Sequence, residues 1–439
     1  MPIYQRLSLN LYTAFALLAG TAYIAYLSLE PYRLSPHLWS ITSFIGIALL
    51  LFTYQRCTRK KSRLSAKTVM IVAIFLHLIA CLGQPFMEDD YFRYLWDGMR
   101  FYETGSPYGS APADSFTDNN ISPHFQQILD QINYPDIPTI YAPVLQYVFL
   151  LNHLLFPGDV NGLQILFSMF NLGLIALLLR HAQPQAAMLY AWNPLVLKEI
   201  AFTAHPDGLG ALLLFAAALF LYKKQLFAAA TLLALALASK IFALLLLPFF
   251  VFNSQPKHWL SFFGVFIAIY LPFIIHGSSD VLGLSAFAQD WQYNASLYAL
   301  LHSALSSQTS KLILLALFSF GYFIYLYKYQ QSSRQLPRMD IVIAAFLFIS
   351  PVLNVWYWLW LLPFAVIYPS RWAWGSCALL SLAYWNGLYL ELEDYHPYQQ
   401  LSWVVWLQFS GIVLLMLWDC YNPWELNTKL KLLETNSSL

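Results

Sequence analysis

The sequence predicts an all-α, polytopic membrane protein. Of its 439 residues, 59% are hydrophobic and only 10% are charged, whereas an ordinary soluble domain is about 25% charged. Apolar runs of roughly 17–20 residues, long enough to cross a bilayer as helices, recur along the whole chain. The net charge of +1 offers no basic footprint for a nucleic acid. The four scattered cysteines show no spacing typical of a zinc site or a disulfide framework.

Charge patterning orients the first helices. The segment 55–67 carries six Lys or Arg residues and no acidic residue, so the positive-inside rule places it in the cytoplasm. Helices at about 7–29 and 38–54 precede it, and a helix at about 68–84 leads to a large external loop. The apolar piece Tyr141–Phe156 is short for a span and contains Pro143, so we expect it to lie at the interface or to re-enter.

The remaining apolar runs predict helices at about 161–180, 186–203, 206–222, 226–239, 241–253, 259–276, 311–328, 341–353, 356–369, 373–390 and 401–418. In total we expect about 12–14 transmembrane helices. The predicted parts are 1–67, with two extra N-terminal helices and the basic cytoplasmic loop; 68–369, the central membrane module; and 370–439, with C-terminal helices and a cytoplasmic tail. This arrangement puts the polar segments 277–294 and Glu391–Tyr395 outside.

The external loop 85–140 is the strongest functional signal, and we expect it to bear interfacial helices. Nine of the chain's 22 acidic residues fall in it, opposed only by Arg93 and Arg100. It opens with three consecutive carboxylates, Glu88, Asp89 and Asp90, next to an apolar segment. Like charges beside a low-dielectric phase are costly, so such clusters usually serve a function.

Other polar residues are predicted to reach the same face. These are His205 and Asp207 at a turn between helices, Lys240 at the next turn, Asn294 in the loop 277–294, and Tyr357 beside Asn354. A membrane-side site of carboxylates, a lysine, a histidine and aromatic rings suits a ligand with a sugar, a phosphate and an apolar tail.

Each of these residues also has a purely structural interpretation. Asp90 can cap the helix that follows it, and Asp97 can pair with Arg93 or Arg100 at helical spacing. Lys240 can extend to the interface, and His205 can be a hydrogen-bonded turn residue. Three tryptophans fit an interfacial belt as well as a ligand platform: Trp356, Trp358 and Trp360.

Several motifs in order resemble integral-membrane glycosyltransferases of the GT-C superfamily. The first runs from Asp89 to Gly98 with Gly105–Tyr108, and Ile137–Pro143 closes the same loop. The others are Trp192–Pro194 with Glu199, His205 and Asp207; Lys240 with Leu247-Pro248; Asp290–Tyr298; and Ser350-Pro351 with Trp356-Tyr357 and Leu361–Pro363. Within the superfamily the chain is most similar to bacterial polyprenyl-phosphate-mannose-dependent mannosyltransferases, and also to the catalytic subunit of glycosylphosphatidylinositol mannosyltransferase I.

The resemblance implies an inverting hexosyltransferase with a GT-C-like module over 68–369. Its donor would be a polyprenyl- or dolichyl-phosphate sugar, with mannose the expected sugar. Asp90, and then Asp89, are the candidate general bases, and Lys240 is the candidate cation for the leaving phosphate. The expected substrate-binding residues are Glu88, Arg93, Tyr94, Asp97, His205, Asp207, Lys240, Asn294 and Tyr357.

No cofactor is required on this reading, although Glu88 and Asp90 are suitable ligands for Mn²⁺ or Mg²⁺. The expected partners are the lipid-phosphate sugar, a glycolipid or glycan acceptor, and membrane lipids. The expected location is a bacterial inner membrane with a periplasmic site, or the endoplasmic reticulum membrane in a eukaryote. A lipid-linked-sugar transporter or flippase, and a membrane glycan ligase or polymerase, remain alternatives.

Overall fold

The computed structural model describes residues 4–30, 33–59, 64–332, 335–387 and 401–424. Within these ranges every regular element is helical, and the single β-type pairing is an isolated bridge between Tyr293 and Val352. The predicted all-α class is therefore confirmed.

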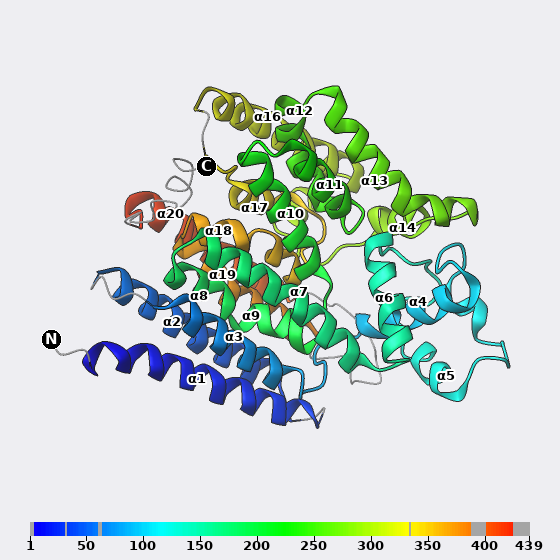
Figure 1. The fold of residues 1–439 in the computed structure, drawn as a ribbon, viewed down its shortest axis with the longest axis horizontal. Helices are drawn as coiled ribbons and strands as arrows, with labels where there is room; N and C mark the ends of the chain where they lie inside the picture. Colours follow the sequence, from blue (N-terminus) through cyan, green and yellow to red (C-terminus); the bar gives the residue numbers. More distant parts are fainter. Residues whose placement is uncertain (1–3, 31–32, 60–63, 333–334, 388–400, 425–439) are drawn as a thin grey trace, which may run out of the picture.

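The N-terminal part begins with three helices, α1 (Tyr4–Ser28), α2 (Pro36–Arg59) and α3 (Ala66–Ala80). They lie side by side, in blue, along one flank of the molecule (Figure 1). Ser65 starts α3, since its hydroxyl accepts a hydrogen bond from the backbone N–H of Thr68 at 3.0 Å; such a cap satisfies a donor that the first turn leaves unpaired.

The acidic segment 85–140 and the residues after it form a separate group of short helices. These are α4 (Asp90–Thr104), η1 (Pro112–Ser115), α5 (Pro123–Leu129) and α6 (Pro143–Leu155), drawn in cyan at the right of Figure 1. The piece predicted to lie at the interface thus becomes α6, which packs along α4. Gly98 permits this contact, because a Cβ there would lie 2.4 Å from the carbonyl oxygen of Phe149.

The central helices are α7 (Val160–His181), α8 (Pro184–Ala191), α9 (Pro194–Val196), η2 (Leu197–Phe202), α10 (Asp207–Tyr222), α11 (Leu226–Leu237), η3 (Ile241–Leu246), α12 (Leu247–Asn253) and α13 (Pro256–Ile275). The remaining helices are α14 (Val281–Asp290), α15 (Leu297–His302), α16 (Ser307–Ser332), α17 (Met339–Ile349), η4 (Val355–Trp360), α18 (Leu362–Ile367), α19 (Arg371–Leu380), η5 (Ser381–Gly387) and α20 (Ser402–Tyr421).

The predicted number of spanning helices needs correction. Six helices of the described chain are long and apolar enough to cross a membrane, or up to seven if the pair Pro194–Phe202 and Asp207–Tyr222, bent by 116°, is one span. Several predicted crossings are instead short apolar helices, such as Ala66–Ala80 and Met339–Ile349. Apolar composition predicts burial, but proline residues and 3₁₀ or π turns divide these runs into pieces that other helices surround. The acidic turn Glu391–Tyr395 lies outside the described residues.

Basic residues gather where several helices end. The Nζ of Lys223, after α10, lies 3.5 Å from Nε2 of His181 at the end of α7. Lys224 donates to Asn253 at the end of α12 at 2.6 Å, and Arg371 pairs with Asp419 near the end of α20 at 2.8 Å. The acidic segment is distant from these groups in the sequence, and Figure 1 shows it at another edge of the molecule.

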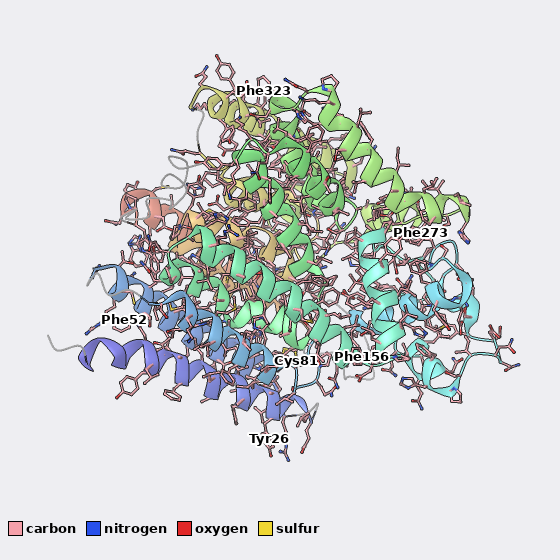
Figure 2. All side chains as sticks on the ribbon, in the orientation of Figure 1. Tyr26, Phe52, Cys81, Phe156, Phe273 and Phe323 are labelled. Carbon is pink, nitrogen blue, oxygen red and sulfur yellow. The ribbon has the colours of Figure 1, made fainter. Side chains whose placement is uncertain are left out.

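The core is dominated by aromatic side chains. Trp192, Trp358, Trp360 and Trp374 are among the largest fully buried residues, and side chains fill the interior between the helices (Figure 2). The interpretation of Trp358 and Trp360 as interfacial belt residues is therefore wrong. Their positions in the sequence are typical of a belt, but η4 turns inward and α10 and α18 pack against it.

We predict that Gly98→Ala destabilises the protein, since the added methyl group meets the backbone of α6. Gly264→Ala in α13 is the matched control, because nothing lies within 4 Å of a Cβ at that position. Overpacking at Gly98 should cost about 1–3 kcal/mol, whereas Gly264→Ala should be neutral or stabilising. Thermal unfolding of both variants in detergent measures this, and equal midpoints would contradict the close approach of α4 and α6.

Candidate functional site

The predicted catalytic carboxylates lie side by side at the start of α4. One amide group holds both, because Nδ2 of Asn133 donates to Oδ1 of Asp89 at 2.6 Å and to Oδ1 of Asp90 at 3.2 Å. The hydroxyl of Tyr141 donates to Oδ2 of Asp90 at 3.2 Å. Helix α4 begins at Asp90, and Asp89 in the N-cap position makes no side-chain capping bond. The capping interpretation of Asp90 is therefore wrong, and its side chain faces the segment 133–141.

The acidic cluster resists full ionisation. Burial, and then repulsion by Asp90, raises the pKa of Asp89 to about 6. Burial holds the pKa of Glu88 well above its usual range; Lys198 opposes this shift, whereas Asp90, Glu199 and Asp89 add to it. Protons are therefore retained in this cluster at pH values at which isolated carboxyl groups are ionised.

His205 sits at a break in the chain between η2 and α10. Ala204 adopts a left-handed backbone conformation with φ of 56°, which is strained for a residue with a side chain. The N–H of His205 donates to the carbonyl oxygen of Glu199 at 2.8 Å, continuing the wide π-type turn. Such turns are frequent at functional sites, and this one brings the imidazole next to Asp90.

The hydrogen bonds of His205 assign its proton. The hydroxyl of Thr203 donates to backbone carbonyl oxygens of Lys198 and Glu199, so toward Nδ1, 3.0 Å away, it acts as an acceptor. Nδ1 also lies 3.0 Å from Oε2 of Glu199. Nδ1 therefore carries the proton, and Nε2 faces Oδ2 of Asp90 at 3.9 Å. That distance exceeds a hydrogen bond, and the buried Nε2 has no hydrogen-bond partner in the described structure.

A buried ion pair lies next to this histidine and fixes its position. Lys198 and Glu199 are both 0% exposed, and Nζ of Lys198 lies 3.3 Å from Oε2 of Glu199. The hydroxyl of Tyr384 donates to the other oxygen of Glu199, and its ring lies under the ammonium of Lys198 at 3.9 Å. Glu199 is thus compensated by a cation and by hydrogen bonds, as a buried charge requires.

A second ion pair joins two further predicted residues. Nζ of Lys240 donates to both carboxylate oxygens of Asp207, at 2.7 and 2.9 Å, and Nε1 of Trp360 donates to Oδ1 of Asp207 at 2.7 Å. The ammonium also lies 4.6 Å from the centre of the Tyr357 ring. The Lys240 side chain is 20% exposed, so it is anchored by Asp207 and does not simply extend to the interface.

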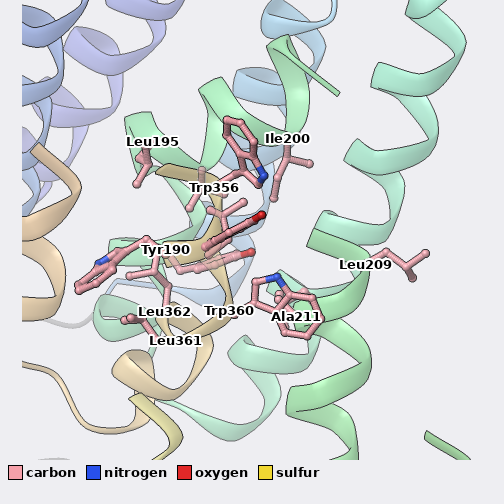
Figure 3. Close-up of a cluster of buried hydrophobic side chains, with 14 of the residues drawn as sticks. Tyr190, Leu195, Ile200, Leu209, Ala211, Trp356, Trp360, Leu361 and Leu362 are labelled. Atoms are coloured by element: carbon pink, nitrogen blue, oxygen red, sulfur yellow. The ribbon is translucent and has the colours of Figure 1, made fainter. Parts of the chain in front are cut away.

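Aromatic residues of η4 connect the two charged groups. The ring of Trp356 stacks on His205 at 4.0 Å, and its neighbour Tyr357 is the ring beneath Lys240. Figure 3 shows Trp356 and Trp360 on the same segment, with Trp360 close to Ala211 of α10. Gly210 makes room for this packing, since a Cβ there would lie 2.2 Å from the Trp360 ring.

Three residues predicted to bind substrate hold the acidic segment together. Arg93 pairs with Asp97 at 2.9 Å and donates to the carbonyl oxygen of Ile137 at 3.0 Å. The other oxygen of Asp97 accepts from Thr139 at 2.5 Å and from Gln146 at 2.9 Å. Tyr94 is buried and stacks on Phe149 at 4.8 Å. These contacts give all three side chains a structural role, which positions the segment that carries Tyr141.

Asn294 is buried away from these contacts and has a left-handed backbone with φ of 47°. Its Nδ2 donates to the carbonyl oxygen of Leu353 at 3.5 Å, and its Oδ1 has no hydrogen-bond partner in the described chain. The side chain ties the segment after α14 to the segment before η4. Substrate binding by Asn294 therefore stays a prediction, and the structure shows which two segments its side chain joins.

Some residues of the site were not predicted to belong to it. Asn133 and Tyr141 bind the carboxylates, Trp360 binds Asp207, and Tyr384 binds Glu199. Tyr141 had a sequence signal as part of the motif Ile137–Pro143, and Trp360 had one as a tryptophan of a possible ligand platform. As for metals, the described residues contain no group of three or more His, Cys, Asp or Glu side chains that could hold an ion.

The fold and the site define a helical membrane protein with a polar site made of carboxylates, a histidine and a lysine. Residues 159–255 match the model of the MptA/B family, described as alpha-(1->6)-mannopyranosyltransferase, N-terminal domain. The chain therefore contains a domain of this mannosyltransferase family within a multi-span membrane protein, and it is a glycosyltransferase. The matched residues include His205, Asp207 and Lys240, but not the acidic segment. Comparisons with curated proteins and with solved structures found no match.

We predict that Asp89→Asn stabilises the protein at neutral pH. The folded pKa of Asp89 is raised, so its contribution to stability is complete below its ordinary pKa of 3.8 and is lost as pH rises through about 6. An asparagine keeps an oxygen for Asn133 and carries no charge. The unfolding midpoint should rise by about 2 °C or more at pH 7.5, and the difference should vanish near pH 4. The exposed Asp136→Asn is the control; a gain for Asp89→Asn that is independent of pH would contradict the prediction.

We also predict strong coupling between Lys198 and Glu199. Lys198→Met should cost about 3–5 kcal/mol, because it leaves a buried carboxylate without its cation. The double variant Lys198→Met/Glu199→Gln should recover most of that loss. A double-mutant cycle from denaturant unfolding in detergent measures the coupling, and additive losses would show that the pair does not act as a unit.

Proposed function

We propose that this protein is an inverting mannosyltransferase that moves mannose from a polyprenyl- or dolichyl-phosphate to an acceptor hydroxyl at the periplasmic or luminal face. The observation that carries the proposal is the pairing of an accessible carboxylate, Asp90, with a separate fixed ammonium, Lys240, across one aromatic wall. The Asp90 side chain is 23% exposed, whereas the His205 side chain behind it is 0% exposed. Asp90 is therefore a carboxylate that an entering hydroxyl can reach.

Proton removal takes place at the gap between Asp90 and His205. Oδ2 of Asp90 and the unpartnered Nε2 of His205 are 3.9 Å apart, and both accept hydrogen bonds when His205 is neutral. An acceptor hydroxyl in this gap donates its proton to Asp90 as it attacks the anomeric carbon. Glu199 fixes the orientation of the imidazole through Nδ1, so that Nε2 faces the gap as a hydrogen-bond acceptor.

Lys240 stabilises the departing lipid phosphate. An ammonium has three donors, and Asp207 occupies two directions, which leaves one for a phosphate oxygen. Asp207 and the Tyr357 ring hold the ammonium in place before the substrate arrives. A preorganised cation in a site with little water favours the charge that develops as the glycosidic bond breaks.

Inversion follows from a direct attack opposite the leaving group, which needs a base and a phosphate site at different positions. Asp90 and Lys240 satisfy this requirement. An inverting enzyme that forms an α-linkage needs a β-configured donor, so the family's α-(1→6) product links this proposal to β-linked lipid-phosphate mannose. The basic residues at the ends of α7, α10 and α12 support a cytoplasmic side away from the acidic segment.

Transfer is proposed to need no divalent cation. Lys240 already supplies positive charge for the phosphate, and the raised pKa of Glu88 disfavours the ionised form that Mn²⁺ or Mg²⁺ requires. Full activity in the presence of a chelator is expected. Glu88 and Asp90 are the carboxylates to substitute if a chelator abolishes transfer.

The central prediction is that the purified protein transfers radiolabelled mannose from synthetic β-polyprenyl-phosphate mannose to an α-mannoside acceptor. Asp90→Asn should reduce kcat by about 10²–10⁴-fold, and Lys240→Ala by about 10²-fold or more. Lys240→Arg, which keeps the charge, should retain more activity than Lys240→Ala.

Asp136→Asn is the control for the loss of a carboxylate in the acidic segment and should leave transfer unchanged. The α-configured donor should be inactive. If Asp89→Asn abolishes transfer while Asp90→Asn does not, the base is Asp89. Turnover of the α-donor would refute inversion, and no turnover of any lipid-phosphate sugar would refute this donor class.

A further inference from the structure

A surface cleft lies beside α4, next to the segment that carries the proposed catalytic carboxylates. It has a volume of about 470 Å³ and is lined by α4, α5, the residues before α7 and the segment that follows α3. Tyr91, Phe92 and Leu95 form its α4 wall, and Ile128 of α5 faces them. None of the proposed steps of proton removal or phosphate binding uses this cleft.

The polar lining of the cleft is uncharged over most of its surface. Three glutamine side chains, Gln84, Gln127 and Gln131, line it and are exposed. Within the described chain their amides make no side-chain hydrogen bond, so their donors and acceptors are available to a ligand. Asp159 is the single acidic side chain of the lining, and it already accepts a hydrogen bond from the backbone N–H of Asn161 at 2.8 Å.

The lining also contains no lysine or arginine, and its histidine, His124, contacts the carbonyl oxygen of Gly158 at 3.3 Å. An anionic group such as the donor's phosphate therefore meets no permanent cation there and is better accommodated at Lys240. Carboxamides, by contrast, offer two donors and an acceptor at adjacent positions, which complements neighbouring hydroxyl groups. The rings of Tyr91 and Phe92, 4.2 Å apart, supply an apolar surface for the C–H face of a pyranose ring. Amides with aromatic surface favour a neutral sugar chain.

The lining of the cleft includes residues that are close in the sequence to the proposed catalytic carboxylates and to the amide that holds them. Tyr91 directly follows Asp90, and Gln131 precedes by two residues the Asn133 that holds Asp89 and Asp90. A chain of sugars bound along α4 and α5 would thus have one end at the proposed base. The volume exceeds that of a single hexose, which suits a ligand of two or more residues.

We infer that this cleft binds the neutral mannan chain of the acceptor and presents its terminal 6-hydroxyl to Asp90. The inference rests on the proposed function, because it names the substrate that the transferase elongates. It also separates the two substrates physically: the sugar chain of the acceptor lies between α4, α5 and the start of α7, whereas the donor phosphate lies at Lys240.

The test measures binding and transfer separately on the full-length protein in lipid nanodiscs. The probe is free α-(1→6)-linked mannotriose, and its Kd is determined by saturation-transfer NMR. The variant is Gln127→Ala/Gln131→Ala. The matched control is Gln126→Ala, because Gln126 lies on the same helix, hydrogen-bonds Asp130 at 3.0 Å and does not line the cleft. The same trisaccharide on a lipid anchor distinguishes a glycolipid acceptor from a free glycan.

Gln127→Ala/Gln131→Ala should weaken mannotriose binding about tenfold, as expected for the loss of roughly two hydrogen bonds. It should raise KM for the acceptor by a similar factor and leave kcat and the donor KM unchanged. Gln126→Ala should behave as wild type. Equal weakening for the free and the anchored sugar supports the cleft for either form of the acceptor.

Two results would overturn the inference: wild type that does not bind mannotriose, or binding that the double variant leaves unchanged. Both results leave the transfer assay of the proposed function unaffected. Conversely, weakened binding in the double variant together with no mannosyl transfer by wild type would support the cleft and refute the proposed donor. The two failures can therefore be told apart.

Discussion

The buried pair of Lys198 and Glu199 determines much of this site. Both side chains are fully inside an apolar helix bundle, where an unpaired charge is strongly unfavourable. Glu199 satisfies its two oxygens with Lys198, His205 and Tyr384, and of these partners Tyr384 comes from a distant part of the chain. The orientation of His205 toward Asp90 depends on this arrangement, since Nδ1 is held by Glu199. Both members of the pair act on the pKa of Glu88, which Lys198 lowers and Glu199 raises.

The break between η2 and α10 makes this arrangement compatible with a membrane span. A regular helix through residues 194–222 would satisfy its own backbone and would not bring His205 next to Asp90. The bend of 116° and the strained Ala204 place His205 beside Asp90 and Asp207 beside Lys240. Irregular backbone at such depth is tolerated where surrounding protein satisfies it, and here Thr203 and His205 donate their N–H groups to the preceding turn.

The sequence pointed to many of the polar residues that meet in this cluster but not to the contacts that each of them makes. Helical spacing predicted that Asp97 pairs with Arg93 or Arg100, and the structure shows the pair with Arg93. The spacing did not show that Thr139 and Gln146 donate hydrogen bonds to Asp97, because those contacts depend on how residues 139–146 fold back onto α4. Asn133 and Tyr384 carry no local motif, so their contacts with Asp90 and Glu199 could not be predicted. For the three tryptophans of η4, local sequence could not distinguish a membrane belt from a buried wall.

The sequence by itself determined the helical membrane class, the acidic segment before α6, and the residue types available for proton transfer and phosphate binding. These follow from composition and local pattern, which fix how each segment partitions between lipid and water. The tertiary structure decided the number of full-length spans, the ion pair between Lys240 and Asp207, and the gap between Asp90 and His205. Those features depend on contacts between segments far apart in the chain, whose energy no local pattern contains. The same holds for the glutamine-lined cleft, which exists only because α5 and the start of α7 meet α4.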